Sequence, residues 1–101
     1  MIRRDGLIVQ KTLSFSIAII KFCTHLSDKR QFVISNQLMK SGTSIGANVF
    51  EAQYAESRFD FIHKMKIAQK EANESLYWIL ICETLEESAE QKELMIIANE
   101  F

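Results

Sequence analysis

Residues 41–48 read Ser41-Gly42-Thr43-Ser44-Ile45-Gly46-Ala47-Asn48, a run of small side chains within a stretch that otherwise favours a long helix. A glycine in a helix interior costs about 1 kcal/mol relative to alanine. Two glycines four residues apart are therefore expected where the structure requires the absence of a side chain. Residues four apart lie on one face of a helix, so Gly42 and Gly46 predict a flat strip on which a second helix packs closely.

A second strip of small residues lies at Ala68 and Ala72, and Ser75 continues it at coiled-coil spacing. Large apolar residues precede and follow this strip. We expect it to face Gly42 and Gly46, so that two helices approach each other closely where their side chains are smallest.

The composition favours long helices. The chain has 101 residues, no proline and only three glycines, and proline breaks helices while glycine weakens them. The length suits one domain with one core, small enough for oligomerisation to contribute to its stability. We predict an all-α fold, an antiparallel up-down four-helix bundle in a single domain covering residues 1–101.

Periodicity and turn signals divide the chain into four expected helices, the last of them short. We place them at about residues 8–27, 30–55, 58–87 and 89–101. Three capping boxes, in which an acceptor side chain is followed three residues later by an acidic or amide side chain, mark the turns at 28–31, 57–60 and 88–91.

The first helix and the end of the third carry more apolar surface than one bundle covers. Residues 13–26 are apolar around most of the helix, and residues 76–82 are apolar without exception. A helix of that kind must be covered from several sides. We therefore expect a homo-oligomer, and aromatic anchors are the usual centres of such contacts. The expected interface residues are Phe15, Ile19, Phe22, Tyr77, Trp78 and Ile81.

Three polar residues are predicted to form a buried set. Ser44 and Asn48 share a helix face beside the glycine strip, and Glu71 on the third helix is the natural acceptor, with Glu74 as its substitute. A buried polar group without a partner costs about 1–3 kcal/mol, so we expect the set to fix the helix register. The alternative, a carboxylate placed for acid-base chemistry, requires a second group and a pocket.

Charge is divided unevenly along the chain, although the formal net charge is only −1. Residues 71–101 contain eight glutamates and one lysine. An acidic stripe at 83–90 is either solvated or contacts basic residues of an adjacent subunit. The best basic cluster is Arg58, Lys64, Lys66 and Lys70. It is either a solvated helix face or a band that contacts nucleic acid in a salt-dependent way.

No set of residues indicates catalysis or a cofactor, so we expect neither an enzyme nor a small-molecule substrate. Asp60 and His63 have the carboxylate-x-x-His spacing, but a di-iron bundle requires two such motifs and two more carboxylates. The alternative is that Asp60 caps a helix and His63 lies at the surface. We expect no bound metal.

The cysteines and the N-terminus indicate a cytoplasmic protein. Cys23 and Cys82 are isolated within apolar helical runs, which predicts buried thiols and a reducing compartment. The start of the chain lacks a signal-peptide cleavage pattern. No uninterrupted apolar run approaches the roughly 20 residues of a membrane span, so we expect no membrane contact.

Several of these segments also carry a family likeness. They are SGTSIGANVFEA at 41–52, FDFIHKMKIA at 59–68, KEANE at 70–74 and Tyr77-Trp78. Together they resemble the bacterial four helix bundle proteins, which include proteins encoded in intervening sequences of large-subunit ribosomal RNA genes. The similarity spans about residues 11–87.

The resemblance implies an antiparallel four-helix bundle that assembles into a ring, typically a pentamer, with a role that is mostly unassigned. The accessory variability proteins of diversity-generating retroelements look like relatives, and there a basic ring contacts a reverse transcriptase and nucleic acid. The alternative function is therefore a nucleic-acid-binding or reverse-transcriptase accessory protein. Two features depart from the pattern: the fourth helix is short, and the last third of the chain is acidic.

Overall fold

Three α-helices make up the part of the chain that the structure describes. Helix α1 runs Leu7–Asp28, α2 runs Phe32–Ala52 and α3 runs Arg58–Asn99. This computed structural model describes the backbone of residues 6–99 and the side chains of residues 6–85 and of Ile97.

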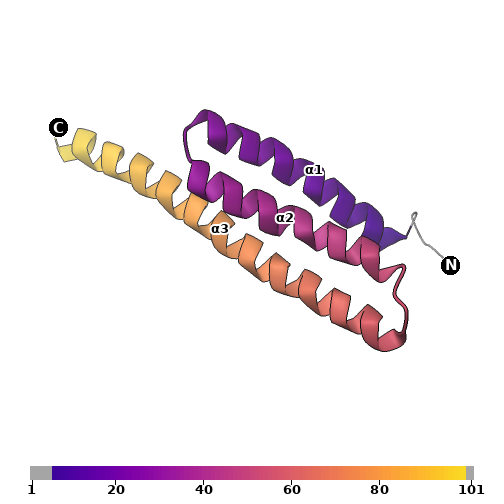
Figure 1. Cartoon of the computed structure of the whole chain (residues 1–101). Helices are drawn as coiled ribbons and strands as arrows, with labels where there is room; N and C mark the ends of the chain where they lie inside the picture. Colours follow the sequence, from indigo (N-terminus) through magenta and orange to yellow (C-terminus); the bar gives the residue numbers. More distant parts are fainter. Residues whose placement is uncertain (1–5, 100–101) are drawn as a thin grey trace.

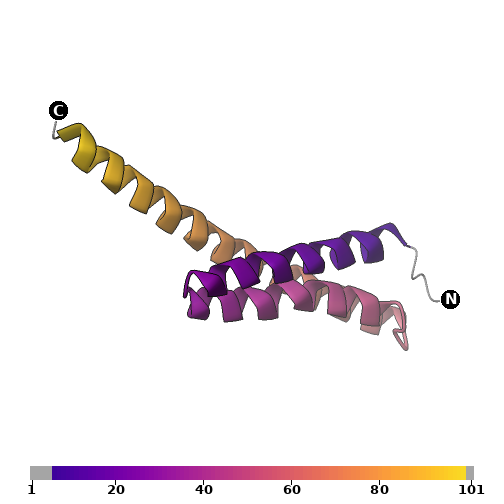
Figure 2. The ribbon, with the colours of Figure 1, turned by 90° about the horizontal axis from the view of Figure 1, so that it is seen from above.

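Helix α2 lies between the other two (Figure 1). It packs against α1 on one side and α3 on the other, whereas no Cα atom of α1 comes within 8 Å of a Cα atom of α3 among the described residues. The second half of α3 projects beyond the ends of α1 and α2, as both views show (Figures 1 and 2). The molecule is correspondingly elongated, with extents of 65 × 23 × 21 Å.

The all-helical fold is confirmed, but a four-helix bundle is not. The described residues form three helices, and α3 continues through residues 87–89, where a turn was predicted. Residues 83–93 contain neither glycine nor proline and are rich in strong helix formers. Ser88 therefore lies inside a helix, and the capping pattern there is not used. Residues 100 and 101 of the predicted fourth helix lie outside the described residues.

Two small clusters form the core. Ile19, Cys23 and Leu26 of α1 meet Leu38 of α2 in the first, against which part of α3 packs through Trp78, Ile79 and Cys82. The second contains Val9, Val49 and Ala68, one residue from each helix. The buried residues of α1 follow each other at intervals of three, four or seven, so α1 buries a single narrow seam.

The turn between α1 and α2 is not closed by the predicted capping box. Helix α2 begins after Gln31, and no side chain caps its first turn. The backbone closes the turn instead: Arg30 adopts a left-handed conformation with φ of 63°, and the Gln31 N–H donates to the Leu26 carbonyl at 2.9 Å. A positive φ is uncommon for a residue other than glycine.

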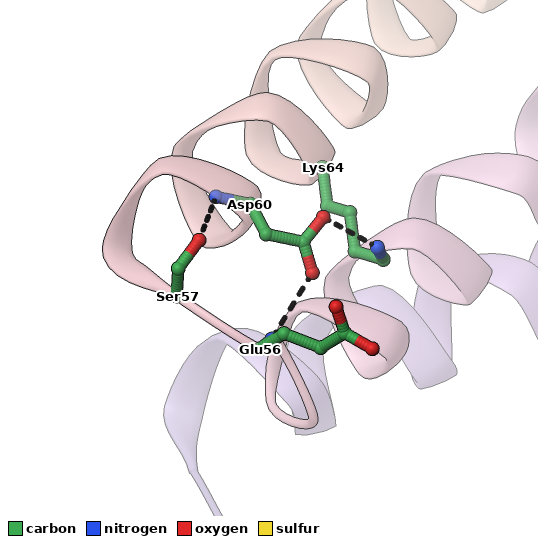
Figure 3. Close-up of polar contacts among 4 residues, drawn as sticks. All are labelled: Glu56, Ser57, Asp60 and Lys64. Atoms are coloured by element: carbon green, nitrogen blue, oxygen red, sulfur yellow. Dashed lines mark hydrogen bonds and ion pairs between the residues drawn. The ribbon is translucent and has the colours of Figure 1, made fainter.

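The predicted cap at the start of α3 is present, but the Asp60 carboxylate reaches the Glu56 N–H, one residue before the Ser57 N–H that a regular capping box uses (Figure 3). The Asp60 N–H donates to Ser57 Oγ at 3.0 Å, and the Glu56 N–H donates to Asp60 Oδ2 at 3.1 Å. Lys64 Nζ lies 2.8 Å from Asp60 Oδ1. The hydrogen bonds from Lys64 and Glu56 hold the pKa of Asp60 below its ordinary value of 3.8, so the carboxylate remains ionised until the pH falls below that value.

Replacing Ser57 by alanine is expected to destabilise the protein by about 1 kcal/mol, because the first turn of α3 loses its hydroxyl acceptor. Chemical denaturation followed by circular dichroism measures the change. Ser14, an exposed serine within α1, supplies the control. Ser14→Ala should leave stability unchanged or slightly raised, and equal losses in the two variants would contradict the role of the cap.

Candidate interaction surface

The glycines of α2 face α1. A Cβ atom added at Gly42 would lie 2.7 Å from Cγ2 of Ile19, and one added at Gly46 would lie 3.2 Å from the Thr12 carbonyl oxygen. The close approach that the glycines predicted is therefore present. Its partner was predicted wrongly, since the strip packs on α1 and not on Ala68 and Ala72.

The four-residue spacing of the glycines identifies one face of α2, but it does not identify which of the two helices that pack on α2 lies against that face. Helix α3 does bring small residues toward α2: Ala68 is 4% exposed and packs in the second core cluster, while Ala72 is half-buried. A hydrogen bond on that side joins Ser75 Oγ and Ser41 Oγ at 2.9 Å, and Ser75 Oγ lies 2.8 Å from the Glu71 carbonyl oxygen.

The predicted polar set of Ser44, Asn48 and Glu71 does not form as expected. Ser44 Oγ donates to the Lys40 carbonyl at 2.6 Å, and Asn48 Nδ2 donates to the Ser44 carbonyl at 2.8 Å. Both side chains thus bond to their own helix. Both are only partly buried, and a carbonyl four residues earlier is the nearest acceptor.

Serines outside the predicted set form the buried polar contacts between the helices. Ser35 and Ser41 are buried on α2. Ser35 Oγ donates to the Cys23 carbonyl at 2.9 Å and lies 2.7 Å from Ser27 Oγ, which ties α2 to α1. The sequence signal that could have identified these serines is their position among the apolar residues that form the buried face of the helix.

The two cysteines approach each other across the core but are not placed for a disulfide. Burial raises the pKa of the Cys23 thiol, and the neighbouring Cys82 raises it further. Disulfides require Cα atoms within about 7 Å, and every Cα separation between α1 and α3 exceeds 8 Å. A bond between them would therefore require the backbone to move.

The basic cluster does not form one patch. Lys64 bonds to Asp60, whereas Arg58, Lys66 and Lys70 are exposed. Lys64 and Lys66 are two residues apart and so point to different sides of α3. The nucleic-acid alternative stays a prediction.

Asp60 and His63 show no sign of a metal site in the described part of the chain. Asp60 is engaged by Lys64 and by the Glu56 N–H, and His63 is exposed. No group of three or more His, Cys, Asp or Glu side chains is gathered there.

The structure exposes apolar side chains on both flanks of the narrow α1 seam. One flank carries Ile8, Phe15 and Phe22, spaced by seven residues, and the other carries Leu13, Ile17 and Ile20; these six are 37–53% exposed. Ile8 lines an open pocket of about 770 Å³ together with Phe61 of α3. The flank with Ile8 is therefore turned toward α3.

Helix α3 also exposes apolar side chains. Phe61, Leu76 and Leu80 are 40%, 55% and 49% exposed. Trp78, by contrast, packs against the cluster that contains Ile19 and Cys23 of α1.

Of the predicted interface residues, Phe15, Phe22 and Tyr77 are exposed, and Trp78 and Ile81 are half-buried. Ile19 is only 4% exposed and fills the space beside Gly42, so its assignment to the interface was wrong. The physical reason is that Ile19 belongs to the buried seam of α1, which the apolar run around the helix concealed.

The prediction that no segment resembles a membrane span also needs correction. By length and composition alone α1 is apolar enough to cross a membrane, and only 22% of its most apolar window is buried within the chain. A helix buried between subunits has the same composition, so this feature does not distinguish the two. The cytoplasmic location stays a prediction.

A family model for the 23S rRNA-intervening sequence protein matches residues 4–100. The chain belongs to this family. The resemblance drawn from the motifs at 41–78 is thereby confirmed.

One similar crystal structure is that of a protein of unknown function from the S23 ribosomal protein family of Bacteroides thetaiotaomicron. It is 46% identical over 74% of this intervening sequence protein and 70% of that chain, with a TM-score of 0.72. A comparison with curated proteins finds no match.

Leucine at position 42 is expected to destabilise this family member by about 3 kcal/mol, because the added side chain collides with buried Ile19 and overpacks the α1–α2 contact. Thermal and chemical denaturation measure the loss. Ala47 is exposed on the same helix, and Ala47→Leu should be tolerated. A Gly42→Leu variant as stable as the Ala47→Leu control would contradict the close packing of α1 on α2.

Alanine at Ser75 should cost about 1–3 kcal/mol, since buried Ser41 loses its partner across the α2–α3 contact. The double variant Ser41→Ala/Ser75→Ala should cost less than the sum of the two single changes. Urea denaturation of all four proteins closes the cycle. Strict additivity would show that the two hydroxyl groups do not interact.

Proposed function

We propose that this intervening sequence protein is a non-enzymatic homo-oligomeric helical module that serves as an interaction or scaffold protein. The observation that carries the proposal is the exposure of apolar side chains on both flanks of α1. Contiguous exposed apolar surface of this kind marks an interaction site.

Aromatic side chains supply the anchors for such a contact. Phe15 and Phe22 are 37% and 38% exposed on α1, and Tyr77 is 60% exposed on α3. The Tyr77 ring packs edge to face on Trp78, with centroids 5.6 Å apart, so it is held in place before a partner arrives. Rigid aromatic groups contribute much of the binding energy at protein interfaces.

The charged residues with catalytic spacing support a structural role. Asp60 caps α3 and forms an ion pair with Lys64, so its carboxylate is engaged in contacts other than one with His63. The similar crystal structure is of a protein of unknown function. The resemblance described above implies a ring, typically of five subunits, and the experiment below counts the subunits directly.

Light scattering coupled to size exclusion in detergent-free buffer tests the proposal. The expected result is a defined multiple of the 11.7 kDa chain mass. Phe15→Asp should shift the protein toward single chains, because a charge in the interface must be desolvated. Val33 is 72% exposed at the start of α2, and Val33→Asp serves as the control that keeps the assembly. A folded wild-type monomer at micromolar concentration would overturn the proposal.

A further inference from the structure

We propose that the outer flank of α1 in one copy packs against the outer flank of α3 in a second copy, so that copies join head to tail. The inference rests on the proposed homo-oligomer and adds which two surfaces meet. The outer flank of α1 consists of Leu13, Ile17 and Ile20, and the outer flank of α3 consists of Ala72, Leu76 and Leu80.

A groove beside the outer flank of α1 makes room for a helix of the second copy. It is an open cavity of about 480 Å³ between α1 and α2, and its lining includes Leu13, Gly46 and Phe50. Gly46 has no side chain to fill the groove, and Phe50 is exposed at it. Ile17 and Ile20, four and seven residues after Leu13, continue the exposed apolar surface along α1.

The hydroxyl groups that line the groove are already engaged. Thr12 Oγ1 donates to the Ile8 carbonyl at 2.9 Å, and Ser16 Oγ donates to the Thr12 carbonyl at 2.9 Å. Sites for small molecules combine apolar walls with a few polar groups that fix the orientation of the ligand. This groove therefore suits the apolar side chains of another helix better than a polar ligand.

The outer flank of α3 cannot reach this groove within its own chain. Leu76 and Leu80 are each two residues from Trp78, so they point away from the side of α3 that packs against the core cluster of α1. No Cα atom of α1 lies within 8 Å of a Cα atom of α3 among the described residues. The two outer flanks can therefore meet only when they belong to different copies.

The packing within one copy determines the register of the contact. Ile19 lies beside Gly42, and Ser75 bonds to Ser41, so Ile19 and Ser75 lie at nearly the same level along α2. Helices α1 and α3 both run antiparallel to α2 and hence in the same direction (Figure 1). A rotation axis along the helices brings α3 of one copy beside α1 of the next without a change of level. The residues just after Ser75 then face those just after Ile19.

Opposite charges flank the contact in this register. Lys21 is exposed next to Ile20, and Glu83 is exposed on α3. Neither forms an ion pair among the residues whose side chains the structure describes. Cys82, which precedes Glu83, packs against the core cluster of Cys23, which places Glu83 within about one turn of Lys21. The charges therefore favour this pairing of a second copy over one in the opposite direction.

A contact between two different surfaces leaves one surface of each kind free at the ends of any open series of copies. Such a series has a defined mass only when it closes into a ring. The defined multiple of the chain mass that is expected for the assembly therefore corresponds to a ring, with one contact of this kind for each subunit.

Two variants of the full chain that alter opposite sides of the contact test it. Ile17→Asp and Leu76→Asp should each elute below the wild-type mass in light scattering coupled to size exclusion, because a charge at the contact must be desolvated. An equimolar mixture should form pairs with one chain of each variant, since one unaltered flank of each kind remains. Leu7 is 71% exposed in the first turn of α1, outside both outer flanks, and Leu7→Asp should keep the wild-type mass.

A charge exchange at exposed positions tests the register without a change in the apolar surface. Lys21→Glu and Glu83→Lys should each raise the concentration at which the assembly dissociates by roughly fivefold, the effect of an exposed ion pair. Both changes in the same chain should return it to the wild-type value, because every contact then contains one charge of each sign.

Circular dichroism establishes that each variant remains helical before its mass is compared. Retention of the wild-type mass by either aspartate variant, or a mixture without mixed pairs, would overturn the contact, since a contact between like surfaces is broken by only one of the two changes. A double charge variant weaker than both single variants would also overturn it. In these cases a wild-type multimer leaves the proposed function in place, whereas a wild-type monomer overturns both.

Discussion

The approach of α1 to the glycine face of α2 determines the rest of this structure. Gly42 and Gly46 leave room for Ile19 and for the backbone at Thr12, so α1 docks through a single narrow seam. A helix held through so narrow a seam keeps its flanks uncovered. The apolar residues on those flanks are too numerous to be incidental, and they supply the surface that the proposed assembly uses.

Hydrogen bonds from small side chains accompany the packing on both sides of α2. Ser41 and Ser75 join α2 to α3, and Ser35 joins α2 to the Cys23 carbonyl of α1. Hydroxyl groups in such positions have few alternative partners, so they favour one register of the helices over its neighbours. Small residues therefore serve α2 on both sides, by close approach and hydrogen bonding toward α1 and by hydrogen bonding toward α3.

The consequence is a core too thin for the amount of apolar surface in the chain. Two clusters of a few residues hold the three helices together, while Phe15, Phe22 and Tyr77 remain exposed. Membership of the 23S rRNA-intervening sequence protein family identifies the chain without assigning it a chemistry. The arrangement of its surface accordingly carries the functional argument.

The sequence by itself determined the helical class, the close approach at Gly42 and Gly46 and the cap of α3 by Ser57 and Asp60, because these depend on backbone propensity and on contacts within a few residues. The tertiary structure alone decided which helix meets the glycines, that Ile19 is buried, and that Ser44 and Asn48 bond to their own helix. Each of these outcomes depends on which neighbouring helix lies against a given face. Helical periodicity identifies the face but does not identify the neighbour. The continuation of α3 past Ser88 belongs with them, since a capping pattern starts a helix only where the chain turns.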